Sequence, residues 1–140
     1  MKRTINMYKP VKAIGLAMVL GTVCLFSQTS PGTAANVLQA LDPDHDGTVD
    51  LNEAKTAGAA VFDRLERDHD GTLDARELKG RLSAKELAAA DPDHDGTLTK
   101  DEYLALVEKR FAAANPDNDG TLDSKELKSP SGRALLRLLK

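Results

Sequence analysis

Two stretches of the chain carry apolar residues at the spacing of one helical face. The apolar positions are Ala57, Val61, Phe62 and Leu65 in the first stretch, and Leu104, Val107 and Phe111 in the second. We therefore predict two amphipathic helices, over residues 54–65 and 103–114, whose apolar faces form the core.

The segment 78–90 lacks such an uninterrupted pattern. Gly80 weakens a helix there, and Ser83 followed by Glu86 is the signature of a capping box, which marks a new helix start. We predict two short helices with a turn between them. Residues 36–41 predict a short helix that leads into the first long one.

The C-terminal tail predicts one further helix. The run Ser129-Pro130-Ser131-Gly132 ends a preceding helix, and proline suits the first turn of a new helix. The apolar positions that follow are Leu135, Leu136, Leu138 and Leu139. We expect these leucines to cover the core of a monomer, and the alternative is a dimer face, which would make the protein a metal-dependent dimer.

The first 35 residues have the pattern of a secretory signal peptide. A basic start, from Lys2 to Lys12, precedes an apolar run from Ala13 to Phe26, and cleavage is expected after Ala34 or Ala35. The run is 14 residues long, whereas a membrane span needs about 20 apolar residues, so an uncleaved anchor is the less favoured alternative. Cleavage would remove the single cysteine, Cys24, and would place residues 36–140 in the periplasm as a single domain.

Charge narrows the choice of partners. The first 35 residues hold four basic and no acidic residues, so residues 36–140 carry 15 basic against 22 acidic residues, a net charge near −7. This balance argues against nucleic acid and against anionic membrane surfaces as partners, and it favours cations.

The acidic residues are concentrated in a repeated loop. Asp42 opens a stretch in which oxygen donors occupy positions 1, 3, 5, 7, 9 and 12, with Gly47 at position 6 and Glu53 at position 12. This is the ligand pattern of an EF-hand loop, where glycine permits the sharp turn and the final glutamate supplies two oxygens. The pattern recurs three times, and the turn glycines lie 24, 25 and 24 residues apart. A regular internal repeat of this kind is typical of an array of identical units.

We name these stretches loop 1 (42–53), loop 2 (66–77), loop 3 (91–102) and loop 4 (115–126). The predicted ligands of loops 1 and 2 are Asp42, Asp44, Asp46, the carbonyl of Thr48, Asp50 and Glu53, then Glu66, Asp68, Asp70, the carbonyl of Thr72, Asp74 and Glu77. Those of loops 3 and 4 are Asp91, Asp93, Asp95, the carbonyl of Thr97, Thr99 and Glu102, then Asn115, Asp117, Asp119, the carbonyl of Thr121, Asp123 and Glu126.

The short period means that neighbouring loops share the helical segment between them. An unbroken helix of about 12 residues spans about 18 Å and separates successive loops, whereas a broken segment folds back and brings its loops together. We predict an all-α helical bundle with its four loops at the periphery, paired 1 with 4 and 2 with 3. The competing arrangement pairs 1 with 2 and 3 with 4.

The all-oxygen ligand set predicts a hard cation and disfavours zinc or copper. His45, His69 and His94 all stand at loop position 4, between ligand positions, so we expect them not to coordinate. Loops 1 and 2 each carry five acidic residues at ligand positions, and loops 3 and 4 carry four. Like charges about 5 Å apart cost about 3 kcal/mol per pair at an effective dielectric near 20. Excess carboxylate therefore favours a trivalent ion of calcium-like size over calcium itself.

Proline at position 2 of loops 1, 3 and 4 fixes the first turn. With this proline and the close repeat, as in Asp91-Pro92-Asp93-His94-Asp95-Gly96, the chain resembles the lanmodulin family. The resemblance implies selective lanthanide binding in the periplasm, a largely disordered metal-free state that folds on binding, and a weaker fourth loop, where Asn115 replaces a carboxylate. Loop 2 departs from the family pattern with Glu66 and Arg67, so loops 2 and 4 are expected to be the weaker sites.

Two rival functions share part of this pattern. A periplasmic calcium buffer or sensor would use the same oxygen ligands, although a sensor's target groove is often rich in methionine, and residues 36–140 contain none. An adhesion module similar to dockerins has loop–helix repeats of this length, but only two of them beside an enzyme. We expect no catalytic role, because the carboxylates are committed to the loops and no Ser–His–Asp arrangement is evident.

Overall fold

The computed structural model describes residues 34–140, and describes side chains from Val37 onward. Most of the predicted signal peptide, including Cys24, lies outside these residues and its cleavage stays a prediction. The helices in the described part are α1 (Ala34–Leu41), α2 (Leu51–Leu65), α3 (Ala84–Ala90), α4 (Lys100–Ala114) and α5 (Pro130–Leu136). The strands are β1 (Val49–Asp50), β2 (Thr72–Leu73), β3 (Leu98–Thr99) and β4 (Thr121–Leu122). The mostly helical class predicted from the sequence is confirmed.

Both long helices begin earlier than predicted, inside the acidic loops. In α2 the side chain of Asp50 accepts a hydrogen bond from the Glu53 backbone N–H, and Glu53 in turn accepts from the Asp50 N–H. Thr99 and Glu102 make the same reciprocal pair at the start of α4. Such a capping box satisfies N–H groups that the first helical turn leaves free. Positions 9 and 12 of the loop therefore also start the helix.

The prediction of two short helices in 78–90 was wrong in its first half. Only α3 is helical, and it begins after Ser83, which forms a capping box with Glu86. The preceding segment, from Asp74, makes isolated turns in which the Leu78 N–H donates to Asp74 O at 3.0 Å. Gly80 ends these turns at φ +83°, a left-handed conformation that glycine adopts without steric cost. The segment after loop 4 is likewise a turn, and not the helix that the sequence suggested.

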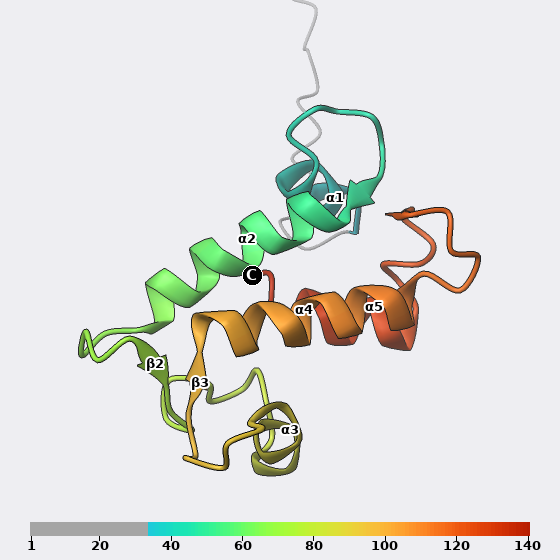
Figure 1. Ribbon diagram of the computed structural model, residues 1–140. Helices are drawn as coiled ribbons and strands as arrows, with labels where there is room; N and C mark the ends of the chain where they lie inside the picture. Colours follow the sequence, from blue (N-terminus) through green and yellow to red (C-terminus); the bar gives the residue numbers. More distant parts are fainter. Residues whose placement is uncertain (1–33) are drawn as a thin grey trace, which may run out of the picture.

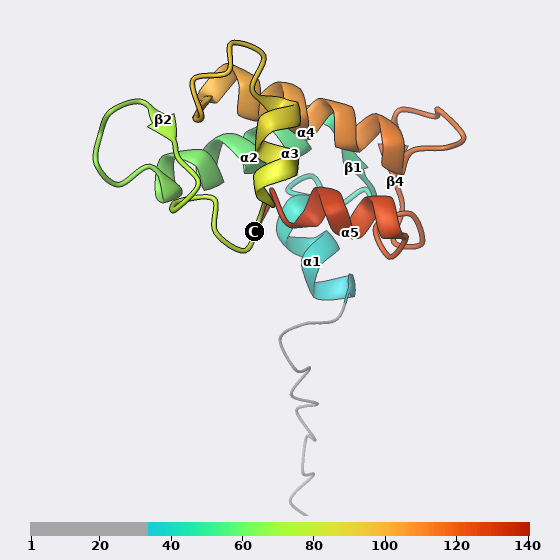
Figure 2. The same cartoon turned by 90° about the horizontal axis from the view of Figure 1, so that it is seen from below.

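Two short antiparallel ladders join segments that are distant in sequence. β1 pairs with β4, with Val49 opposite Leu122, and β2 pairs with β3, with Leu73 opposite Leu98. These four apolar residues all stand at loop position 8 and are fully buried. The unbroken helices α2 and α4 run between the two ladders, which lie at opposite ends of the molecule (Figures 1 and 2).

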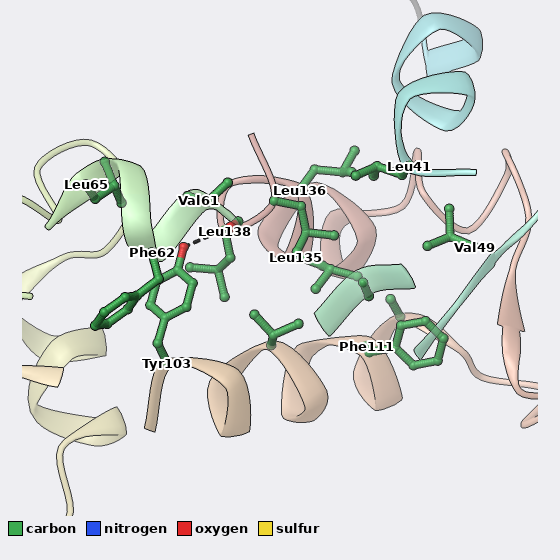
Figure 3. Close-up of a cluster of buried hydrophobic side chains, with 14 of the residues drawn as sticks. Leu41, Val49, Val61, Phe62, Leu65, Tyr103, Phe111, Leu135, Leu136 and Leu138 are labelled. Atoms are coloured by element: carbon green, nitrogen blue, oxygen red, sulfur yellow. Dashed lines mark hydrogen bonds between the residues drawn. The ribbon is translucent and has the colours of Figure 1, made fainter. Parts of the chain in front are cut away.

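The core lies where α2, α4 and α5 meet (Figure 3). Tyr103 is fully buried; its ring packs edge-on against Phe62, with centroids 5.8 Å apart, and its hydroxyl donates to Leu138 O at 2.8 Å. The tail leucines are all buried, as predicted: Leu135, Leu136, Leu138 and Leu139. In the predicted stripes, Ala57 and Leu104 are only half-buried, while Tyr103 lies deeper than either.

Arg110 connects the smaller helices α3 and α5 to α4. Arg110 of α4 donates to Ala134 O of α5 at 2.7 Å and to Glu86 of α3 at 2.9 Å. Hydrogen bonds from the Ser83 backbone and side chain, together with the charges of Arg110 and Arg137, hold the pKa of Glu86 below its ordinary value. In residues 34–140, no helix is both long enough and apolar enough to cross a membrane.

Candidate metal centre

Each acidic loop makes the same backbone turn. Position 4 has a positive φ in all four loops, between 57° and 63°, and is occupied by His45, His69, His94 and Asn118. The position-6 glycines have φ between 86° and 93°. Histidine and asparagine are among the non-glycine residues most tolerant of the left-handed region. The three histidines are exposed, and they serve the loop by accepting this backbone conformation.

The first carboxylate of loops 1 and 3 is buried inside its own turn. Asp42 accepts hydrogen bonds from the N–H groups of Gly47, at 3.0 Å, and Asp46, at 3.1 Å. Asp91 accepts from Gly96 at 2.9 Å and from His94 at 2.7 Å. Burial raises the pKa of both aspartates, but these N–H donors outweigh it and hold each pKa below its ordinary value. Both groups are thus kept ionised.

Other carboxylates in the same loops have raised pKa values. Burial raises the pKa of Glu53, and the charges of Asp44, Asp50 and Asp42 raise it further, against a hydrogen bond from the Asp50 backbone that lowers it. The pKa of Asp93 is raised first by its side-chain contact with Asp91. Carboxylates held this close favour a bound proton or a cation.

The structure brings nine predicted ligands together in three groups. In each group, one carboxylate oxygen per residue lies within 4.8 Å of the others. The groups are Asp42, Asp44 and Glu53 in loop 1, Glu66, Asp68 and Asp70 in loop 2, and Asp91, Asp93 and Glu102 in loop 3. None of these groups, found within residues 34–140, contains a histidine, although His69 Nδ1 lies 3.5 Å from Glu66 Oε2.

The other side-chain ligands predicted at positions 5 and 9 stabilise the turn itself. Position 5 accepts hydrogen bonds from the threonine at position 7, as Asp46 does from the Thr48 N–H at 2.8 Å and hydroxyl at 2.7 Å. Position 9 caps the segment that follows, as Asp123 does for the Glu126 N–H at 2.7 Å. Loop 4 forms no group of three carboxylates within 4.8 Å in the described chain, since its first position is the neutral Asn115.

Four buried oxygens without hydrogen-bond partners show whether a cation would fit these loops. Within the described residues, the buried side-chain atoms without a hydrogen-bond partner are Glu53 Oε1, Glu66 Oε1, Asn115 Oδ1 and Glu126 Oε1. All four belong to predicted ligands at loop positions 1 or 12. A buried acceptor without a partner costs about 1–3 kcal/mol, and a hard cation bound by these oxygens would remove that cost. The residues present therefore fit an oxygen-bound metal ion.

Loop 2 contains a contact that the ligand pattern did not reveal. The Arg67 N–H, at position 2, donates to Glu77 Oε1 at 2.9 Å. Loops 1, 3 and 4 have proline at position 2, which has no N–H to donate. The available signal was the missing proline, which removes stiffness from the loop and also adds an N–H donor.

The comparisons with known proteins agree with this geometry. The EF-hand family model (described as EF hand) matches residues 84–107, which cover α3, loop 3 and the first half of α4. The fold, the acidic loops and this match are similar to those of EF-hand proteins, a class built around metal binding.

One relative points to a particular family among the EF-hand proteins. Lanmodulin from Methylorubrum extorquens is 64% identical over 55 residues, which is 39% of this chain and 41% of the relative. The match thus spans about two fifths of the relative's length. Together the two matches support a lanmodulin-like EF-hand protein, as the resemblance in the sequence predicted.

Proposed function

We propose that this protein selectively binds trivalent lanthanide ions through four EF-hand loops, arranged in the pairs 1 with 4 and 2 with 3. The observation that carries the proposal is the set of buried oxygens without partners, all at ligand positions 1 or 12. Resemblance to a protein named lanmodulin supports the lanthanide as the ion. The two ladders support the pairing, because each joins position 8 of one loop to position 8 of another.

Electrostatic repulsion in the loops supports a trivalent over a divalent ion. With five acidic residues at ligand positions, loop 1 keeps a charge of −3 around a divalent ion and of −2 around a trivalent one. Burial raises the pKa of Glu53, and the charges of Asp44, Asp50 and Asp42 raise it further, in keeping with this repulsion. A higher ionic charge offsets more of it.

The four loops are expected to differ in affinity. In loop 2 the Glu77 oxygen that should bind the ion already accepts a hydrogen bond from Arg67. In loop 4 the neutral Asn115 stands at position 1, where loops 1 and 3 have the carboxylates of Asp42 and Asp91. Loops 1 and 3 are therefore the stronger sites, and loops 2 and 4 the weaker ones.

Metal binding is expected to drive folding. Of the 22 acidic residues, 18 stand at loop ligand positions, so the metal-free chain concentrates repulsion at the two ends of a small core. A ligand that binds only the folded state adds its binding free energy to folding. Secretion to the periplasm would suit a role in lanthanide uptake, buffering or delivery.

A calcium buffer is the alternative, since the same oxygens are also suitable calcium ligands. The experiment is a circular-dichroism titration of the chain without its signal peptide, at buffered free lanthanum and, separately, free calcium. Tyr103, which adjoins the ligand Glu102, provides a parallel readout through sensitised terbium emission. We expect helix to form at lanthanum concentrations orders of magnitude below those needed for calcium.

The control replaces the position-12 glutamate of all four loops by glutamine, which keeps the side-chain size and removes the charge. This variant should lose the lanthanum response. Folding of the unaltered protein by micromolar calcium with similar strength would refute lanthanide selectivity and would establish the calcium buffer.

A further inference from the structure

A groove of about 780 Å³ lies between the Gly80 turn and α5. Five basic residues line it: Lys79, Arg81, Arg133, Arg137 and Lys140. The remaining lining residues are small or apolar, such as Ala134 and Leu136, and none is acidic. Figure 2 shows the turn, in yellow-green, passing beside the C end and α5.

The groove is unusual because the chain as a whole is acidic. Outside the loop ligand positions, the described residues include four acidic side chains: Asp63, Glu86, Asp101 and Glu108. Asp63, Glu86 and Glu108 form ion pairs with basic residues outside the groove. The one groove residue that they contact is Arg137, which lies 3.4 Å from Glu86. In residues 37–140, the other four basic side chains of the groove have no carboxylate within 4.0 Å.

The two walls of the groove are held in place relative to each other. Arg81 Nη1 donates to Arg137 O at 2.8 Å, which joins the turn to the end of α5. Arg133 donates to Lys128 O at 2.7 Å and so has a defined position at the start of α5. Both arginines keep further N–H donors, because a guanidinium carries five. The cations are thus arranged around a recess before any ligand arrives.

We propose that this groove binds a small organic anion that carries two or more oxyanion groups, carboxylate or phosphate. Its volume lies in the range of small-molecule sites, which is about 300–1,000 Å³. Arginine pairs with carboxylate and phosphate through two parallel hydrogen bonds, and the apolar residues between the cations suit a carbon skeleton. The acidic remainder of the protein opposes an anionic membrane or nucleic acid as the occupant.

The test uses the full chain without its signal peptide, loaded with lanthanum, and its helical signal is checked first. Naphthalene-1,5-disulfonate is the probe because sulfonates bind lanthanum weakly and leave the loops loaded. Calorimetry should give saturable binding, and the amide resonances of Gly80 and Leu136 should shift. Naphthalene-1-sulfonate, with one charge, should bind more weakly.

The groove variant is Lys79→Gln with Arg133→Gln, and the matched control is Lys85→Gln with Lys109→Gln, two exposed basic residues that do not line the groove. Both lower the net charge equally. We expect about a tenfold or greater loss of probe affinity in the groove variant, little change in the control, and an unchanged lanthanum titration in both. Displacement of the probe by propane-1,2,3-tricarboxylate or by a sugar bisphosphate is also expected, at an unchanged helical signal that shows the loops to be still loaded.

Three results would overturn the proposal. One is equal loss of affinity in the groove variant and the control, which would show only a general charge effect. Another is failure of both competitors to displace the probe, which would leave the naphthalene ring as the bound part. The third is a dimer that dissociates when the groove residues are changed, which would show that acidic loops of a second copy fill the groove. The inference does not depend on which metal the loops bind.

Discussion

Replacement of Arg67 by proline is expected to tighten metal binding in loop 2. The Arg67 N–H donates to Glu77 Oε1 at 2.9 Å, so this oxygen has to give up a hydrogen bond before it can bind an ion. The equivalent oxygens in loops 1 and 4, Glu53 Oε1 and Glu126 Oε1, follow a proline at position 2 and have no such partner among the described residues. Proline would remove the competing donor.

The size of the effect follows from that one hydrogen bond. A hydrogen bond to a charged group contributes about 1.5–3 kcal/mol, which corresponds to roughly 10- to 100-fold in the Kd of loop 2. The residue before position 67 suits a following proline, because Glu66 is extended at φ −67° and ψ 104°. Asp91, which precedes a proline in loop 3, has a similar ψ of 95°.

The assay follows the amide resonance of Gly71 while lanthanum is added from a chelator buffer, because this glycine reports loop 2 alone. Arg67→Ala is the matched control, since it removes the positive charge and keeps the N–H. Equal affinities of Arg67→Pro and Arg67→Ala for lanthanum in loop 2 would refute the reasoning and leave charge as the relevant difference.

Three further changes test the fold. Tyr103→Phe removes the buried hydrogen bond to Leu138 O. It should lower the free energy of unfolding of the lanthanum-loaded protein, measured in urea, by about 1–2 kcal/mol. An unchanged midpoint of urea unfolding would contradict this. Gly132→Ala places a Cβ against the backbone oxygen of Glu126. It should lower the free energy of unfolding by about 3 kcal/mol or more and expose α5 to hydrogen exchange; normal protection of α5 would show that the backbone relaxes easily. The pKa of Glu86 is lowered in the folded state. Its contribution to the free energy of unfolding is therefore present above its ordinary pKa and is lost as the pH falls through the folded-state pKa. Glu86→Gln should therefore lower the free energy of unfolding at neutral pH. A stability difference from the unaltered protein that persists at low pH would contradict the role assigned to Glu86.

Local patterns predicted the long helices and the short helices α1, α3 and α5, and failed for the segments that follow loops 2 and 4. The stripes of α2 and α4 repeat over several turns, so their periodicity outweighs single exceptions such as Leu104. The first half of 78–90 is too short to form a helix without a cap at its end, and Gly80 stops it at a positive φ. No apolar stripe of its own supported the helix predicted before Gly80.

The early starts of α2 and α4 were readable in principle. Asp50 with Glu53, and Thr99 with Glu102, have the capping-box spacing that correctly placed the start of α3. Their assignment as metal ligands hid this second role. One residue serves both purposes because a side-chain oxygen that faces the loop also faces the free N–H groups of the next helical turn.

The sequence by itself determined the loops, because an EF-hand loop is a local structure whose donors, glycine and turn lie within 12 consecutive residues. The tertiary structure determined the contacts that the loop residues make. Only packing shows that Arg67 occupies a Glu77 oxygen, and which buried oxygens have no partner. The basic groove also arises in this way, since its residues come from two segments that are about 50 positions apart in the chain and meet only after α5 docks on α4. Contacts of that range depend on the whole fold, and no short pattern encodes them.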